Sequence, residues 1–132
     1  MKKSLIILVL FLIPFSSQVL AMENELRINK EQPETIHFKD LQIIKIGRNY
    51  EVTGMAKVRK GVFYYSVENG HHVLVPEKKV KLNNLNWVHF KLKISIPSQQ
   101  LPKNGVLMLN LYEKDKRGKI AHSTPIVLDS FK

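Results

Sequence analysis

The five histidines of this sequence are the side chains best suited to hold a metal ion. His71 and His72 are adjacent, and neighbours on a strand point to opposite faces, so these two cannot share one ion without distortion. His37, His89 and His122 are far apart in the chain, and none of them has a carboxylate or a second histidine at a ligating spacing. The sequence therefore assigns no metal ligand and no cofactor, and a histidine-based metal-handling protein stays an alternative.

Catalytic residues are not indicated either. Ser123 follows His122, but a nucleophile and a base that are adjacent on an extended strand face apart. The chain lacks a Gly-x-Ser-x-Gly turn, and no pair of acidic residues stands out among the 11 present. We expect a protein that is not an enzyme.

Lysines supply the candidate binding surface. In two stretches they alternate with apolar residues, which places them on the wet face of a strand. If these strands are hairpin neighbours across Asn83–Asn84, the lysines form one basic patch that attracts an anionic polymer. The alternative is a solvated face that protects a sheet edge from aggregation. The residues are Lys79, Lys81, Lys91 and Lys93.

The same stretches carry no aromatic stack and little arginine, so specific recognition of nucleic acid is not expected.

The strand that carries Lys91 and Lys93 has the clearest pattern in the chain. From Asn86 to Ile96, apolar residues occupy every second position from Val88 onward, and polar residues fall between them. This period of two predicts a strand with one buried and one wet face, as in antiparallel sheets. Pro97 ends the run because proline cannot donate to a continuing ladder.

Similar but less regular runs predict the other strands. Asp40 interrupts the first, Gly54 marks a bulge or a close backbone approach, and Pro125 favours an edge position for the last. Asn69-Gly70 predicts a type I′ hairpin turn. About seven short strands without helical periodicity predict an all-β antiparallel sandwich. Besides the strand within 86–96, the predicted runs are 36–46, 50–56, 62–68, 71–76, 78–82, 106–113 and 120–128.

Three aromatic residues allow two interpretations. Phe63, Tyr65 and Trp87 would suit an exposed platform for a sugar or a base. Apolar neighbours surround each of them, and aromatic residues on central strands of a sandwich are usually core. We therefore expect all three in the core.

The first residues predict export. Lys2 and Lys3 precede an apolar run from Leu5 to Phe15, and Val19-Leu20-Ala21 fits a signal-peptidase site, so residues 1–21 are a predicted signal peptide. The alternative is a membrane anchor, but the run is shorter than the roughly 20 residues that a spanning helix needs. The mature protein would be secreted, with no stable membrane insertion.

Export would leave one domain with a basic charge. Residues 22–34 are polar and predict a flexible leader, and residues 35–132 predict the folded domain. Loss of two lysines with the signal leaves 19 basic residues against 11 acidic ones, a formal charge of +8 that favours anionic partners. No cysteine is present, which excludes disulfides and attachment of lipid to cysteine.

The chain also resembles a known family. The matching features are a strand with Gly-x-Ala, a tryptophan shortly before a phenylalanine, a strand that begins with glycine and ends in an aromatic residue, and a basic turn before the last strand. They occur at Val52–Ala56, Phe63, Val67, Asn69-Gly70, Val73-Leu74, Trp87–Phe90, Ile96-Pro97, Gly105–Leu109, Tyr112-Glu113, Lys116–Lys119 and Ile126–Leu128. In these features it is similar to the immunoglobulin-like domain of bacterial spore germination and sporulation proteins. The resemblance implies an exported, non-catalytic immunoglobulin-like β-sandwich and offers no site residues.

Together these features favour a secreted immunoglobulin-like binding module of the bacterial cell envelope, in contact with an envelope protein or an anionic wall polymer. A role in sporulation or germination rests on the resemblance alone. One alternative is a secreted protease inhibitor that presents the loop Pro97–Gly105. The other is the metal-handling protein named above.

Overall fold

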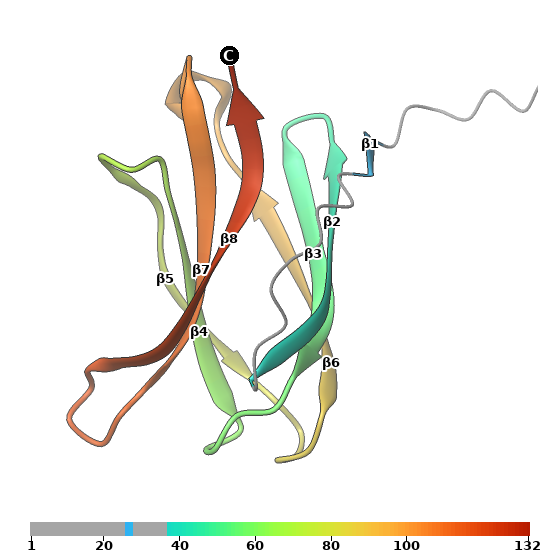
Figure 1. Ribbon diagram of the computed structural model, residues 1–132, viewed down its shortest axis with the longest axis vertical. Coiled ribbons are helices and arrows are strands. Elements are labelled where there is room, and N and C mark those ends of the chain that lie inside the picture. The colour runs from blue at the N-terminus through green and yellow to red at the C-terminus, as the bar shows by residue number, and fades with distance from the viewer. Residues whose placement is uncertain (1–25, 28–36) are drawn as a thin grey trace, which may run out of the picture.

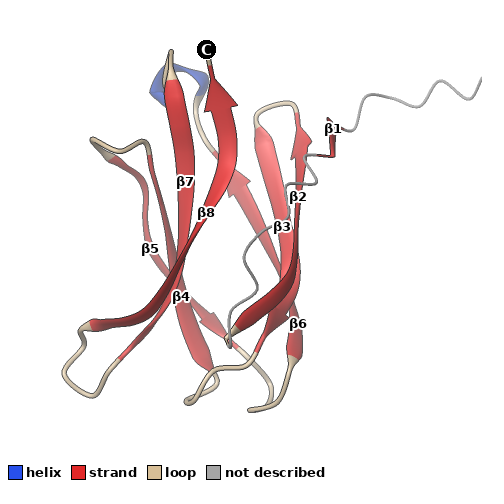
Figure 2. Ribbon diagram, in the orientation of Figure 1, coloured by secondary structure: helices blue, strands red, loops and turns tan. Residues whose placement is uncertain are grey.

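The computed structural model describes residues 26–27 and 37–132, which form two antiparallel sheets packed face to face (Figure 1). One sheet has the order β1-β2-β3-β6 and the other β5-β4-β7-β8. Strands make up nearly all of the regular structure, and the one helical segment described is the 3₁₀ turn η1 (Figure 2). The predicted all-β sandwich is confirmed. The elements are β1 (Leu26–Arg27), β2 (Phe38–Ile46), β3 (Asn49–Ala56), β4 (Val62–Glu68), β5 (Val73–Lys81), β6 (Val88–Ser95), η1 (Ser98–Gln100), β7 (Gly105–Lys114) and β8 (Ile120–Phe131).

Alternation of side chains explains the two layers. In β6, Phe90, Leu92 and Ile94 are buried while the polar residues between them are exposed, as the sequence predicts. In β4, Phe63 and Tyr65 face inward in the same manner. The inward faces of both sheets meet in one hydrophobic core.

The distribution of strands is that of an immunoglobulin-like sandwich. The chain crosses from one sheet to the other between β3 and β4, between β5 and β6, and between β6 and β7. β5 pairs with β4 at the edge of the second sheet. Strand C′ of variable-type domains pairs with strand C in the same position.

The two lysine-bearing strands are not hairpin neighbours, so the condition for a single basic patch is not met. β5 and β6 follow each other in the chain, but they belong to different sheets. The two runs predicted at 71–76 and 78–82 are one strand, β5, which continues through Pro76. A proline is tolerated there because β5 is an edge strand with a register shift opposite Ser66.

The turn at Asn69-Gly70 joins β4 to β5 but is not of type I′. Gly70 has a φ of +88°, whereas Asn69 is not among the residues with positive φ. Instead, the Oδ1 atom of Asn69 accepts hydrogen bonds from the backbone N–H groups of His71 and His72 at 3.0 and 2.8 Å. The asparagine side chain thus stabilises a longer loop than the two-residue turn predicted.

Asp40 and Gly54, which the sequence marks as interruptions, both lie at an irregularity in the β2–β3 ladder. The ladder between β2 and β3 shifts register between Lys39 and Gln42, and Asp40 has a φ of +53°. Gly54 lies opposite this break, and a Cβ atom there would lie 2.6 Å from Leu41 Cδ2 and 3.1 Å from the carbonyl oxygen of Lys39. The close approach expected at Gly54 is confirmed, and no larger residue fits without movement.

The strand β8 forms the other edge of its sheet, as Pro125 predicts. Two register shifts interrupt its ladder with β7, one between Leu107 and Met108 and one between Leu111 and Glu113. Bulges of this kind re-aim the side chains beside them.

Of the predicted leader 22–34, the structure describes only β1, which pairs with Lys45 and Ile44 of β2. The predicted signal peptide, residues 1–21, lies outside the described residues, as does the predicted start of the domain at residue 35.

The core contains an aromatic cluster. The rings of Phe38, Phe63 and Phe90 meet edge to face, with centroids 5.1 to 6.3 Å apart. Phe63 and Tyr65 are buried, as expected, but Trp87 is only half-buried. Trp87 instead packs under the ammonium group of Lys39, whose Nζ lies 4.3 Å from the ring centroid.

Candidate functional site

Three side chains with metal-binding and acid–base chemistry meet at one end of the sandwich, although they are far apart in the sequence. They are His37, Glu113 and His122, and one ligand atom from each lies within 4.8 Å of the other two. The Nδ1 atom of His37 lies 3.1 Å from Glu113 Oε2. The rings of His37 and His122 overlap with centroids 4.2 Å apart. We call these residues the histidine cluster.

Each sheet contributes to the histidine cluster. His37 immediately precedes β2, whereas Glu113 and His122 come from β7 and β8 of the opposite sheet. Glu113 continues the inward-facing series of β7 beyond Leu111 and is only 6% exposed. His37 is buried and His122 is exposed, so the cluster runs from the interior to the surface.

Backbone geometry holds two of these side chains in place. The Oε1 atom of Glu113 accepts a hydrogen bond of 2.9 Å from the backbone N–H of Arg59, which fixes the carboxylate with Oε2 toward His37. His122 lies beside the bulge in the β7–β8 ladder and has a φ of +53°. Residues other than glycine occupy this region infrequently, and such positions concentrate at functional sites.

Two hollows flank the histidine cluster. Glu113 and His122 contribute to the wall of the first, which has a volume of about 450 Å³. His37 lines the second, of about the same volume, together with Leu85 and Trp87. Arg59 lines both, so the two hollows adjoin each other beside the histidine cluster.

The first hollow has an excess of positive charge. Four cationic side chains, Arg59, Lys60, Lys114 and Lys116, stand against two carboxylates. One carboxylate belongs to Glu113 and the other to Asp115, whose Oδ1 atom accepts hydrogen bonds from two backbone N–H groups of its own turn. Among the described residues neither Lys60 nor Lys116 makes an ion pair, so their charges face the hollow and the solvent.

Side-chain contacts connect β4, β5 and β7 on the adjoining outer face of the second sheet. Tyr64 stacks on Tyr112, and the hydroxyl group of Tyr112 donates a 2.6 Å hydrogen bond to Glu77. Burial, together with the hydrogen bond to Glu77, raises the pKa of Tyr112 to about 12. Lys114 also pairs with Glu77 and lies over the Tyr64 ring, which ties one wall of the first hollow to β5.

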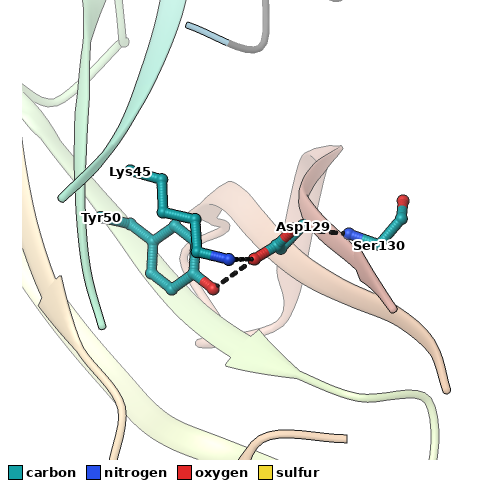
Figure 3. A network of polar contacts seen from close by, with 4 residues as sticks. All are labelled: Lys45, Tyr50, Asp129 and Ser130. Carbon is teal, nitrogen blue, oxygen red and sulfur yellow. Dashed lines mark hydrogen bonds and ion pairs between the residues drawn. The ribbon is translucent and has the colours of Figure 1, made fainter. Parts of the chain in front are cut away.

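A second polar cluster joins the sheets at the opposite end of β2 and β8 (Figure 3). The Oδ2 atom of Asp129 accepts hydrogen bonds from Lys45 Nζ at 2.5 Å and from the Tyr50 hydroxyl at 2.7 Å. Its Oδ1 atom accepts a bond of 2.9 Å from the backbone N–H of Ser130. We call Lys45, Tyr50 and Asp129 the aspartate clamp.

The charges of the aspartate clamp are balanced. Burial by itself would raise the pKa of Asp129, but the hydrogen bonds from Lys45, Tyr50 and Ser130 outweigh it and hold the pKa below its ordinary value. Burial and the neighbouring carboxylate raise the pKa of Tyr50. The clamp has the features of a structural contact, since every acceptor atom of its carboxylate has a donor.

The four lysines of the predicted patch do not share one surface. In the β4–β5 ladder, Lys79 lies opposite Tyr64 and Lys81 lies opposite Val62. Both lysine side chains therefore point outward from the second sheet. Lys91 and Lys93 point outward from the first sheet, opposite Thr53 and Glu51. Because the two sheets pack face to face, the pairs lie on opposite outer faces, and Lys91 is further engaged by Glu51 at 3.1 Å.

The loop Pro97–Gly105 is exposed for most of its length. It contains the turn η1, and Leu101 packs against the buried cluster, as expected. A peptide that enters an enzyme cleft by strand pairing is extended, so this shape does not favour the inhibitor hypothesis.

Sequence reasoning missed the histidine cluster because only the tertiary fold brings its members together. One signal was present. The alternation Leu107, Leu109, Leu111 places residue 113 on the inward face, and a glutamate at an inward position needs a partner. The partner itself, His37, is not predictable from spacing.

Comparison with protein-family models, with curated proteins and with solved structures finds no match to this chain. Within residues 26–27 and 37–132, the structure has no helix of the length and apolar character that a membrane span requires.

Proposed function

We propose that this protein is an exported, non-catalytic binding module of the bacterial cell envelope, and that it binds an anionic wall polymer at the first hollow. The observation that carries the proposal is the charge of that hollow, where four cationic side chains line about 450 Å³ and both carboxylates already accept hydrogen bonds. Fixed charges around a concave surface concentrate anions more effectively than charges on a flat face.

The proposal moves the binding surface away from the lysine pairs on the outer faces. Lys79 and Lys81 remain a solvated pair near a sheet edge, where lysines also prevent edge-to-edge association. The immunoglobulin-like distribution of strands is the fold that the family resemblance implies. The resemblance itself stays part of the proposal, together with export and a role in sporulation or germination.

Retention on purified bacterial cell walls tests the proposal. We expect the protein to sediment with walls at low salt and to be released as salt is raised, because such binding depends on screened charge. The test variant carries Arg59→Gln, Lys60→Gln and Lys116→Gln, which remove charge from the hollow while the backbone N–H that holds Glu113 is kept.

A matched control carries Lys79→Gln, Lys81→Gln, Lys91→Gln and Lys93→Gln on the outer faces. It removes one more charge than the hollow variant, so an effect of net charge alone would be larger in the control. We expect retention to be lost in the hollow variant and kept in the control. The reverse result, or no retention of the parent protein at low salt, contradicts the proposal.

A further inference from the structure

We propose that the histidine cluster binds a divalent transition-metal ion, with His37, Glu113 and His122 as its protein ligands. The site lies in the wall of the first hollow, but the inference does not rest on anion binding there. It rests on the mutual distances of three ligand groups, on the backbone at His122 and on the access that the two hollows provide.

The distances between the three ligand atoms fit metal coordination after a small inward movement of one side chain. Zinc binds imidazole nitrogen at about 2.0–2.1 Å and carboxylate oxygen at about 2.0–2.2 Å, so ligand atoms in a tetrahedral site lie about 3.4 Å apart. His37 Nδ1 and Glu113 Oε2 are already 3.1 Å apart. One ligand atom of each residue lies within 4.8 Å of the other two, so an inward movement of the exposed His122 side chain by at most about 1.4 Å completes the set.

The chemistry of the ligands indicates the class of metal. Two imidazoles and one carboxylate suit zinc and its neighbours among the transition metals, whereas calcium and magnesium require mainly oxygen ligands. Three protein ligands also leave a coordination position open. Because Glu113 and His122 line the first hollow, water or a small anion can reach that position.

The surroundings of the ligands support a built site. The hydrogen bond from the Arg59 backbone to Glu113 Oε1 orients the carboxylate, as contacts behind the ligands do in metal proteins. His122 has a positive φ beside the bulge in the β7–β8 ladder, and its ring lies against that of His37.

Titration of the chelator-treated protein with Co²⁺ tests the site, because a cobalt ion in a site of low coordination number absorbs visible light. We expect saturable binding of a single Co²⁺ per chain and loss of the absorption when Zn²⁺ is added. The test variant is His122→Asn, since asparagine tolerates the same positive φ but removes the imidazole ligand.

We expect His122→Asn to weaken Co²⁺ binding by more than about tenfold. A second variant, Glu113→Gln, keeps an acceptor for Arg59 while removing the charged ligand, and we expect the same loss in folded protein. His89→Asn is the matched control, because His89 is an exposed histidine on the outer face of the other sheet.

A double variant, His71→Asn with His72→Asn, controls for adventitious binding at the β4–β5 loop. Both controls are expected to bind Co²⁺ like the parent protein. Unchanged binding in His122→Asn, loss of binding in the His71/His72 variant, or no saturable binding by the parent protein overturns the proposal.

Discussion

Two polar clusters join the sheets of this sandwich at opposite ends of β2 and β8, and they differ in how their carboxylates are satisfied. In the aspartate clamp, Asp129 receives an ammonium group, a hydroxyl group and a backbone N–H. In the histidine cluster, Glu113 receives one backbone N–H and faces His37, with His122 beside it at the wall of a hollow.

The β7–β8 ladder shows a common origin for both clusters. One of its two register shifts lies beside Asp129 and the other beside His122. Each shift brings a polar side chain of β8 into contact with the other sheet. At one end Lys45 supplies a cation to the carboxylate, while at the other the imidazole of His37 is buried and that of His122 is exposed. The comparison indicates that the first contact stabilises the fold and the second binds a ligand.

Substitution in the hydrophobic core between the two clusters is expected to give the largest loss of stability. Phe90 is buried in the aromatic cluster, so Phe90→Asp places an unpaired charge there and is expected to unfold the domain. Lys91→Asp on the exposed side of the same strand is expected to cost little by comparison. Circular dichroism of both variants checks this, and an equal loss of structure would contradict the assignment of faces.

The aspartate clamp is expected to give the next largest effect. Asp129→Ala leaves the buried hydroxyl group of Tyr50 without its acceptor and removes the partner of Lys45, so we expect a loss of about 2–3 kcal/mol in the free energy of unfolding. Lys91→Gln breaks the exposed pair with Glu51 and is expected to cost less than about 1 kcal/mol. Urea denaturation measures both, and similar costs would remove the distinction between clamp and surface pair.

Acid pH is expected to act on the clamp in a defined direction. The pKa of Asp129 is lower in the folded than in the unfolded protein, so the unfolded state binds the proton first as pH falls. The contribution of Asp129 is therefore complete above its ordinary pKa and is lost as pH falls through the lower pKa of the folded state.

Asp129→Asn should accordingly flatten the fall in stability that the parent protein shows below about pH 5. Urea midpoints measured across this range for both proteins provide the check. Parallel pH profiles would mean that Asp129 is not held as the carboxylate that the clamp requires.

The sequence predicts where the strands lie better than it predicts which strands pair with each other. Alternation identified the inward faces of β4, β6 and β7, and Pro125 indicated an edge strand, because period and backbone chemistry are local. Pairing is not local. Lys79 and Lys91 belong to strands that follow each other, yet the crossover between the sheets puts them on opposite faces.

The same limit applies to the histidine cluster. An inward glutamate at position 113 is a local signal of a buried contact, whereas its meeting with His37 depends on how the two sheets stack. The positive φ of His122 follows from a bulge, and a bulge is set by pairing that the spacing of β8 residues does not reveal.

Thermal unfolding with and without Zn²⁺ tests the difference between the two clusters most directly. A metal that binds only the folded state raises Tm. We predict that Zn²⁺ raises the Tm of the parent protein and of Asp129→Asn by similar increments, although Asp129→Asn starts lower, and that it leaves the Tm of His122→Asn unchanged. A zinc-dependent rise that persists in His122→Asn, or one that disappears in Asp129→Asn, would contradict the assignment of structure to one end and ligand binding to the other.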